Sequence, residues 1–574
     1  MNMYTEEYQR WLSSDAVDGE TKRELSALAG SDEELRYRFS GYLSFGTAGL
    51  RGIMGAGTNM MNVYTVRHAT QGLAQYILSA DAASRGAVIA YDSRIGSRLF
   101  AEAAASVLAA NGIRTFLFDG MRPTPVLSFA VRQLGCAAGI NITASHNSKE
   151  YNGYKAYWSD GAQLAPEQAE VVSRFIRETD ILTGVRVCDF EAAVAAGKIV
   201  MVGKETDESY YENVLRQSID PEVIRRQADM KVVYTPLHGA GRVFVPQILK
   251  RAGFSNVITV PEQMIPDGSF PTVRFPNPEF PEAFALGVKL ARENDSDLII
   301  ATDPDADRTG IMVRRQDGSF TALTGNQTGA LLLHYIISAL KATGTMPPEP
   351  YAVKSIVTTE LASAICRKNG VKLFNVLTGF KFIGEVIKTH EEAGHGSFLF
   401  GFEESYGYLK GTYARDKDAV VASLLIAEMA AAYRERGMTL YDALQELYET
   451  YGYSAEKVVS LTAEGYDGAA RMRALMKELR GEPIRSIGKE TVHAVRDYLT
   501  GRITVMADGS SAETGLPSSD VLYYETEAGD AVIVRPSGTE PKVKLYFLVG
   551  GKTAQETEDK LSRMEADMRA RVTL

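Results

Sequence analysis

Residues 87–118 read AVIAYDSRIGSRLFAEAAASVLAANGIRTFLF. Two short apolar runs enclose a polar turn and a long helical segment. In order, these are the run 87–91, the turn 92–94, the helical segment 99–110 and the run 115–118. A further run, AGINI at 138–142, continues the scheme. Apolar runs that alternate with helical segments are typical of β-α-β units, so the sequence predicts an α/β domain with a mostly parallel sheet.

The same alternation of strands and helices restarts twice along the chain, and a different pattern of elements follows it. The second block has strand candidates at 231–234, 256–260 and 297–301, with helices at 242–252 and 282–294. The third has strands at 351–357, 372–376 and 397–400, with helices at 326–342, 360–369 and 380–393. After a helix-rich stretch at 418–449, strands are expected at 455–461, 521–524, 531–534 and 542–548, with helices at 466–479 and 554–571. We therefore expect three similar α/β domains with mixed, largely parallel sheets, plus a C-terminal α+β domain.

Chain length agrees with that count, because 574 residues at roughly 150 per domain predict about four domains. The Gly/Ser-rich stretch 508–519 is expected to be a surface loop. The expected division is a charged helical arm at 1–40 and domains at 41–205, 206–320, 321–451 and 452–574.

Composition excludes several classes of protein. Hydrophobic residues make up 45% and charged residues 23%, which are ordinary globular values. The formal net charge of −10 disfavours non-specific nucleic-acid binding. The three cysteines are far apart and fit a reducing compartment, and no signal peptide or run of about 18 apolar residues is present. We expect a cytoplasmic protein without a nucleic-acid or membrane partner.

The loop 143–147 (TASHN) follows the apolar run 138–142, at the strand end where open parallel sheets bind ligands. Ser145 in this loop is either a nucleophile or a helix cap. Lys155 follows ten residues later, where a returning strand can aim it at the same point. The G-x-S-x-G pattern of hydrolases is absent, which disfavours acyl transfer. Upstream, the glycine-rich loop 45–52 (FGTAGLRG) contains Arg51 but is not a nucleotide-binding P-loop.

The loop 303–308 (DPDADR) carries three carboxylates at alternate positions directly after a strand candidate. Carboxylates so close together need a cation between them. An EF-hand calcium loop would have glycine at its sixth position and glutamate at its twelfth, where this chain has Arg308 and Arg314. A magnesium site is the better interpretation, and because magnesium fills its coordination shell with phosphate oxygens and water, it indicates a phosphate ligand.

Two further loops suggest sugar and phosphate binding. The loop 401–407 (GFEESYG) has adjacent glutamates that could accept hydrogen bonds from sugar hydroxyls, although a capped helix start would also explain it. Arg415 and Lys417 downstream add positive charge. The loop 535–544 (RPSGTEPKVK) joins an arginine, hydroxyls and glycine in a compact anion nest, with a plain turn as the alternative.

Together the four loops TASHN, DPDADR, GFEES and RPSGT, in this order, resemble those of the α-D-phosphohexomutase family from about Phe45 to the C-terminus. The resemblance implies domains around a central cleft and an enzyme phosphorylated on Ser145. It implies one Mg²⁺ per chain, bound by Asp303, Asp305, Asp307 and a phosphate oxygen on Ser145. The other catalytic residues it implies are Arg51, His146, Lys155 and Arg308. The substrate-binding residues it implies are Thr378, Gly379, Lys381, Glu403, Ser405, Lys417, Arg535, Ser537, Gly538, Thr539 and Lys544.

The stretch 378–382 (TGFKF) resembles the specificity loop of the phosphoglucomutase branch. The implied reaction is interconversion of glucose 1-phosphate and glucose 6-phosphate, with glucose 1,6-bisphosphate as intermediate and activator. The alternatives are a phosphomannomutase, a phosphopentomutase, a glucose-1,6-bisphosphate synthase, a magnesium-dependent sugar phosphatase or a non-catalytic sugar-phosphate sensor. Some relatives have histidine where this chain has Gly407, so Lys155 and Lys417 are the candidates for the general acid/base. Small-molecule sugar phosphates are the expected partners, and the chain is expected to be a monomer or weak homodimer.

Overall fold

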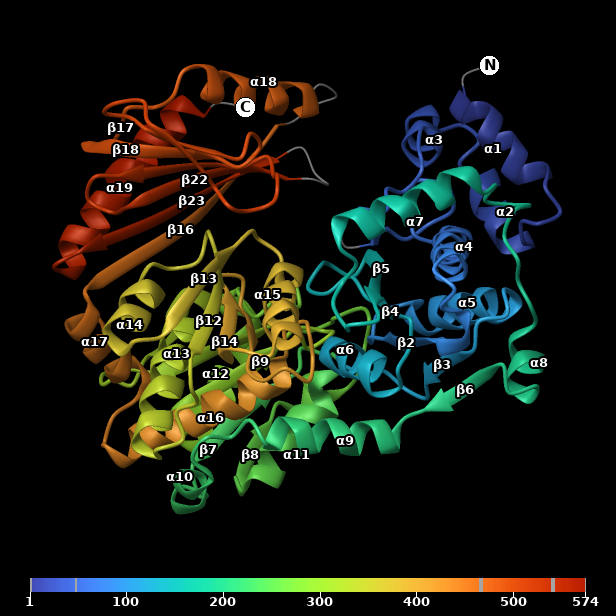
Figure 1. Cartoon of the computed structure of the whole chain (residues 1–574). Coiled ribbons are helices and arrows are strands. Elements are labelled where there is room, and N and C mark those ends of the chain that lie inside the picture. Colours follow the sequence, from blue (N-terminus) through green and yellow to red (C-terminus); the bar gives the residue numbers. More distant parts are fainter. Residues whose placement is uncertain (1–2, 47–48, 464–467, 538–541, 573–574) are drawn as a thin grey trace. The chain divides into compact units, whose positions relative to one another are not determined.

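The computed structural model describes residues 3–46, 49–463, 468–537 and 542–572 (Figure 1). Contacts within the chain divide it into two compact units. The first unit comprises residues 1–322, 387–392 and 407–436, and the second comprises 323–386, 393–406 and 437–574. None of the described helices is both long and apolar enough to cross a membrane.

The N-terminal segment of the first unit folds as three helices around a shared apolar cluster. These are α1 (Met3–Ser13), α2 (Gly19–Ala27) and α3 (Asp32–Phe39). Trp11 is fully buried, and its ring centroid lies 5.7 Å from that of Phe39 and 5.1 Å from that of Tyr64 on the next helix. The Tyr64 hydroxyl donates to the Asp18 carboxylate at 2.6 Å. The charged segment is therefore helical, and it packs against the first α/β domain.

A six-stranded sheet forms the core of that domain, in the order β1-β5-β4-β2-β3-β6. Its strands are β1 (Leu50–Ile53), β2 (Ala87–Tyr91), β3 (Thr115–Phe118), β4 (Ala138–Ile142), β5 (Tyr151–Trp158) and β6 (Ile199–Val202). Its helices are α4 (Val63–Ser79), α5 (Ser97–Ala110), α6 (Thr124–Gln133), α7 (Pro166–Glu178) and α8 (Phe190–Ala195). Strands β2, β3, β4 and β6 pair in parallel, whereas β5 is antiparallel to both β4 and β1. Every residue of β2 and of β4 is buried, which explains their continuous apolar runs.

The first unit contains a second, five-stranded sheet in the order β11-β10-β9-β7-β8. Its strands are β7 (Lys231–Thr235), β8 (Asn256–Thr259), β9 (Leu298–Thr302), β10 (Thr309–Arg314) and β11 (Phe320–Leu323). The helices of this part are α9 (Lys204–Leu215), α10 (Pro221–Arg226), α11 (Gly241–Ala252), α12 (Ala285–Asn294) and α16 (Ala419–Glu435). Strand β7 is parallel to β8 and β9, and β10 returns antiparallel to β9. The tight β9–β10 turn contains the DPDADR motif.

In the second unit, β12 (Pro350–Ser355) lies parallel to and between β13 (Lys372–Val376) and β14 (Ser397–Glu403). The strand β14 continues to Glu403, three residues beyond the predicted end at 400, so the first glutamate of the GFEES motif belongs to a strand rather than a turn. The remaining elements near these strands in sequence are α13 (Gly325–Ala342), α14 (Leu361–Asn369), α15 (Phe380–Ala393), β15 (Gly407–Leu409) and α17 (Leu440–Tyr451).

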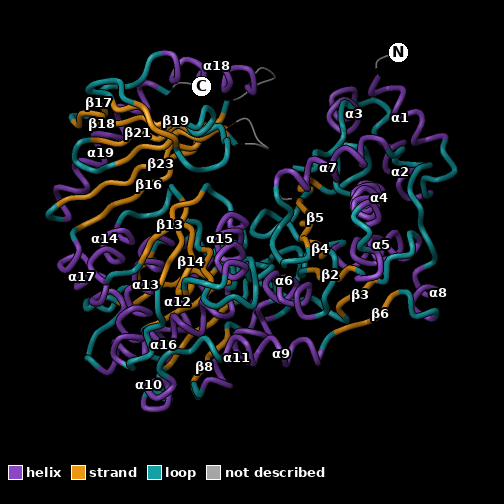
Figure 2. The backbone as a smooth tube through the Cα atoms, in the orientation of Figure 1, coloured by secondary structure: helices purple, strands orange, loops and turns teal. Residues whose placement is uncertain are grey.

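The C-terminal part of the second unit is a β-rich domain, whose sheet Figure 2 shows beside two helices. Its strands are β16 (Tyr453–Thr462), β17 (Ser486–Ile487), β18 (Glu490–Asp497), β19 (Arg502–Val505), β20 (Ser511–Glu513), β21 (Leu522–Thr526), β22 (Ala531–Pro536) and β23 (Lys542–Gly551), and its helices are α18 (Gly468–Gly481) and α19 (Ala554–Arg571). The ladders from β16 through β23, β22, β21, β18 and β19 to β20 are antiparallel.

Side chains of both helices pack on one face of this sheet, with Met476 and Met564 in a buried cluster around Val532 and Leu545. Two sequence expectations need correction here. Strands β18 and β19 were not predicted, and the stretch 508–519, which was expected to be a loop, contains β20. The fold class itself is confirmed: three sheets with parallel strands are followed by a mostly antiparallel domain.

Candidate active site

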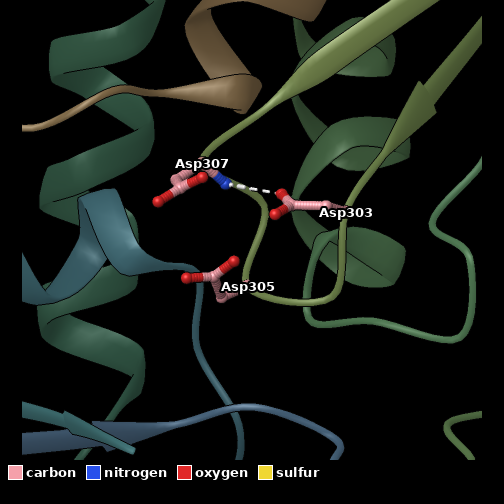
Figure 3. A group of neighbouring side chains, drawn as sticks. All are labelled: Asp303, Asp305 and Asp307. Carbon is pink, nitrogen blue, oxygen red and sulfur yellow. Dashed lines mark hydrogen bonds between the residues drawn. The ribbon is translucent and has the colours of Figure 1, made fainter. Parts of the chain in front are cut away.

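The three aspartates of the DPDADR motif lie together in the turn between β9 and β10 (Figure 3). Asp303, Asp305 and Asp307 are at most 1% exposed, and one carboxylate oxygen of each lies within 4.8 Å of those of the other two. The backbone N–H groups of Asp307 and Arg308 donate to the Asp303 carboxylate at 3.1 and 3.0 Å, which folds the turn back on itself. Across the described ranges, this is the one group of acidic, histidine or cysteine side chains arranged to hold a metal ion.

Charge in this turn is only partly balanced. Burial and the neighbouring aspartates raise the pKa of Asp303 well above its ordinary value. Burial acts in the same direction on Asp307, but Lys155 and Lys417 outweigh it and lower the pKa of Asp307. The Lys155 ammonium lies 2.7 Å from Asp305 and 3.0 Å from Asp307, and that of Lys417 lies 3.3 Å from Asp307. One buried oxygen on each of Asp305 and Asp307 has no hydrogen-bond partner among the described residues, so ligand atoms are available for a cation.

Ser145 lies beside this carboxylate group, although 158 residues separate it from Asp303. Its hydroxyl donates to the Asp303 carboxylate at 2.8 Å, and its Oγ lies 3.2 Å from His146 Nδ1. The backbone of Ser145 has a φ of +53°, a left-handed conformation that is rare for a residue with a side chain. Burial, together with Arg308 and Arg51, lowers the pKa of His146 well below its ordinary value, so this imidazole is neutral at pH 7.

The predicted cations do not all face the carboxylates. Lys155, on the returning strand β5, contacts them directly, as the sequence indicated. Arg51, on β1, donates to the Asn147 side chain of the serine loop at 3.1 Å. Arg308 donates to the Glu279 carboxylate at 2.5 Å and also lies 3.9 Å from the Asp307 carboxylate.

In the second unit, the structure brings two of the predicted sugar-binding segments together. The backbone N–H of Gly379 donates to the Glu403 carboxylate at 2.7 Å, which places the TGFKF stretch against the end of β14. Lys381 lies with its ammonium 5.3 Å from the centroid of the Phe382 ring. Glu404 accepts a hydrogen bond from Ser355 at 3.2 Å. Burial and the adjacent Glu403 raise the pKa of Glu404 to about 7.

The predicted phosphate loop connects β22 and β23. Arg535 and Lys544 are directly opposite each other in this antiparallel pair. Their charges act in the opposite direction to burial on the pKa of Glu404, so both lie within electrostatic reach of the glutamate pair. The backbone N–H of Ser537 donates to the Lys542 carbonyl at 2.8 Å. Gly538 and Thr539, which were predicted to bind phosphate, lie outside the described residues.

Comparison with known proteins identifies the family. Residues 42–181, 208–318 and 324–451 match the phosphoglucomutase/phosphomannomutase alpha/beta/alpha domains I, II and III in turn. The chain belongs to the phosphoglucomutase/phosphomannomutase family. It is therefore an enzyme of the α-D-phosphohexomutase class, as its motifs predicted. The chain is 40% identical over 519 residues to a phosphoglucomutase of Staphylococcus saprophyticus, covering 90% of this chain and 92% of that one.

Solved structures support the family fold at lower identity. A putative phosphomannomutase from Thermus thermophilus superposes with a TM-score of 0.67 at 22% identity, covering 92% of this chain and 99% of that one. An N-acetylphosphoglucosamine mutase from Aspergillus fumigatus, solved in complex with GlcNAc-6P and magnesium, superposes with a TM-score of 0.50 at 14% identity, covering 97% of this chain and all of that one.

Sequence reasoning missed several residues around the family motifs. Asp416 is 1% exposed and accepts from Lys417 Nζ at 2.9 Å and from the Tyr157 hydroxyl at 2.8 Å. Thr124 donates to the Asp305 carboxylate at 2.7 Å and accepts at 2.7 Å from the Asn141 amide. For Asp416, the available signal in the sequence was its position next to Lys417, which was itself a predicted site residue. Thr124 had no comparable signal, because its contact depends on how α6 meets the β9–β10 turn.

Arg415 also departs from expectation. Its guanidinium pairs with Glu391 and donates at 2.6 Å to the Thr412 carbonyl, and the side chain is fully buried. Burial lowers the pKa of Arg415. The sequence suggested that Arg415 would supply positive charge to a phosphorylated ligand, but in the structure this charge is directed to a carboxylate of the protein itself.

Proposed function

We propose that this chain is a mutase that interconverts glucose 1-phosphate and glucose 6-phosphate through a phosphoserine at Ser145 and glucose 1,6-bisphosphate. One observation carries the proposal: the Ser145 hydroxyl lies 2.8 Å from a carboxylate of the buried aspartate group. A serine hydroxyl at a cation site is suited to phosphoryl transfer and has no evident structural purpose there. Family membership and the 40% identity to a phosphoglucomutase support glucose as the sugar.

Magnesium is the metal that the donor set fits. Asp303, Asp305 and Asp307 offer only hard carboxylate oxygens, two of which have no hydrogen-bond partner among the described residues. When bound, Mg²⁺ supplies charge neutralisation to the equatorial oxygens of the transferring phosphoryl group.

The protein's own residues then perform the transfer. In the first step the Ser145 Oγ–phosphorus bond breaks while the free hydroxyl of the substrate forms a new bond to phosphorus and loses its proton. That proton has to reach the Ser145 oxygen that leaves phosphorus, and Lys155 and Lys417, whose ammonium groups contact the aspartates, are the candidates to relay it. The ammonium gives one proton to the serine oxygen and takes up the proton of the substrate hydroxyl. His146 is neutral, so its Nδ1 can form a hydrogen bond with the serine oxygen without adding charge to the site. Arg51 and Arg308 are proposed to neutralise the phosphoryl group as it moves.

The second unit is proposed to bind the rest of the substrate. Glu403, held by the Gly379 backbone, supplies carboxylate oxygens for sugar hydroxyls. The others proposed to contact the sugar are Thr378, Lys381 and Ser405. The residues proposed to hold the phosphate that does not react are Arg535, Ser537, Gly538, Thr539 and Lys544. The second half-reaction returns the other phosphate of the bisphosphate to Ser145.

A coupled mutase assay with Mg²⁺ and catalytic glucose 1,6-bisphosphate tests this proposal across glucose, mannose and ribose phosphates. We expect turnover with glucose 1-phosphate, its loss in Ser145→Ala, and a phosphate adduct in the intact mass of the wild type that Ser145→Ala lacks. Ser148→Ala, in the same loop, is the matched control and should keep both. Substantial mutase activity in Ser145→Ala, or phosphate release without an isomerised sugar, would refute the proposal.

A further inference from the structure

Arg94, in the polar turn after β2, has no part in the proposed chemistry, yet its contacts concentrate on the serine loop. The side chain is 1% exposed. Its guanidinium donates to the backbone carbonyls of Ser145 at 2.6 Å, Ser148 at 2.8 Å and Tyr151 at 3.0 Å, and also to that of Asn147. One side chain thus binds four carbonyls of the segment that contains the reactive serine.

A second buried group completes this frame. Asp92, whose side chain is fully buried, lies 3.4 Å from the Arg94 guanidinium and accepts from the Thr143 hydroxyl at 2.7 Å. The Thr143 hydroxyl in turn accepts from the backbone N–H of Ser145 at 2.8 Å. The amide of Ser145 is therefore held through Thr143 and its carbonyl through Arg94.

This double attachment matters because of the conformation of Ser145. Its φ of +53° lies in the left-handed region, which costs a non-glycine residue of order 1 kcal/mol and persists only where the surroundings enforce it. The same conformation accompanies the contact between the serine hydroxyl and Asp303. If Ser145 relaxes to an ordinary φ, its backbone turns and the hydroxyl moves away from that carboxylate.

Arginine is suited to this task and lysine is not. The guanidinium has five donors in a rigid planar fork, whereas an ammonium group concentrates three donors at one point. The ring of Phe270, which is 2% exposed, lies 5.0 Å from the Arg94 guanidinium carbon and covers it. The segment containing Phe270 approaches closely, since a Cβ on Gly268 would lie 2.4 Å from the backbone nitrogen of Ile95.

We propose that Arg94 is the positioning residue of the phosphoserine loop: it enforces the left-handed conformation of Ser145 and so aims the serine oxygen at the metal site. This inference rests on the proposed function for its catalytic consequence. Misplacing reacting atoms by about 1 Å costs on the order of 100-fold in rate. Replacing Arg94 by lysine should therefore slow transfer to and from Ser145 by roughly that factor and leave substrate KM within about threefold.

The test compares the variant Arg94→Lys with Arg85→Lys. Arg85 also donates to backbone carbonyls of the same domain, those of Gly135 and Cys136, but not to those of the serine loop. Two measurements are made on each full-length protein. The first is the rate of Ser145 phosphorylation by glucose 1,6-bisphosphate, followed by intact mass and accompanied by kcat and KM. The second is hydrogen–deuterium exchange of peptides covering 143–151.

We expect Arg94→Lys alone to slow phosphorylation about 100-fold and to accelerate exchange within 143–151 with the rest of the domain unchanged. Phosphorylation within threefold of wild type, or unchanged exchange in that peptide, would overturn the proposal. If Arg94→Lys does not fold, Phe270→Leu is the second variant, because it keeps the guanidinium and removes the ring that covers it. We then expect faster hydrogen–deuterium exchange confined to 143–151. Unchanged exchange in that peptide would count against the proposal. A wild type that forms no phosphoserine would refute the proposed function, while the exchange comparison would still decide whether Arg94 fixes the loop.

Discussion

Replacing Lys155 by methionine should strengthen magnesium binding while it weakens catalysis. The Lys155 ammonium lies 2.7 Å from one carboxylate oxygen of Asp305 and 3.0 Å from one of Asp307. Ligand oxygens of the three aspartates lie within 4.8 Å of one another, so a cation bound among them would be about 5 Å from that ammonium. The lysine and the metal therefore compete for the same negative charge, and methionine, whose side chain is one atom shorter, is unbranched like lysine but has no charge.

Coulomb's law gives the size of the effect. A unit charge and a divalent cation about 5 Å apart at an effective dielectric constant of about 20 repel by roughly 7 kcal/mol. Since each 1.4 kcal/mol is about tenfold in affinity, loss of the Lys155 charge should lower the Kd for Mg²⁺ by about 100-fold or more even when structural relaxation takes half of the gain. Turnover should fall, because the same ammonium is a candidate to relay the proton of the substrate hydroxyl.

Isothermal titration of metal-free protein with Mg²⁺ measures the affinity, and the mutase assay at saturating Mg²⁺ measures the loss of turnover. Lys149→Met is the matched control. Lys149 is exposed, and its replacement removes one positive charge from a nearby position in the same chain. We expect its Kd to stay within about threefold of wild type, given how solvent and salt screen an exposed charge. Weaker magnesium binding in Lys155→Met than in wild type would refute the electrostatic argument.

Three further outcomes are expected. Glu404 has a pKa of about 7 against an ordinary 4.5, so its ionisation destabilises the folded chain, and stability is lost as pH rises from about 4.5 to 7. Glu404→Gln should escape this loss and exceed wild type by up to about 3 kcal/mol at pH 9. A difference in thermal unfolding between the two proteins that is the same at pH 4.5 and at pH 9 would contradict it. Glu428 is fully buried on α16 and accepts from one hydroxyl and two backbone N–H groups, so Glu428→Ala should cost about 2–5 kcal/mol in denaturant unfolding. Glu435→Ala, which removes a solvent-exposed ion pair with Arg226 at the end of the same helix, should cost at most about 1 kcal/mol, and equal effects would count against the argument. Asp416→Asn should lower kcat about tenfold without raising KM, because it weakens the hold on the neighbouring lysine ammonium; a rise in KM alone in steady-state assays would assign Asp416 to substrate binding instead.

Much of the fold was readable because buried parallel strands have a distinctive sequence. Strands β2, β3 and β4 have the bounds that their apolar runs predicted, since helices cover both faces of such sheets and few polar residues occur in them. Strand β18 mixes charged and apolar residues, and all three residues of β20 are exposed. Strands of this kind form through backbone hydrogen bonds with a neighbouring strand, so their side chains show no clear pattern in the sequence.

The site divides in the same way. Ser145 and the aspartates could be located because each follows a buried strand, and the strand ends of an α/β sheet are where polar side chains converge. The sequence could not predict which carboxylate each arginine or lysine contacts, because that carboxylate comes from elsewhere in the chain. Arg415 pairs with Glu391, and Lys417, two residues later, contacts Asp307. Two positive residues that are close in sequence thus pair with different carboxylates, and only the tertiary contacts distinguish their roles.

Charge at the metal site follows from contacts rather than from composition. Five carboxylates, those of Asp303, Asp305, Asp307, Asp416 and Glu279, lie around three positive groups, those of Lys155, Lys417 and Arg308. With every group ionised, two negative charges remain, which the two positive charges of one divalent cation would balance. The net charge of −10 for the whole chain could not show this, and neither could the DPDADR motif, which lacks Asp416. The local balance therefore supports a single metal ion next to the serine that is proposed to carry the phosphoryl group.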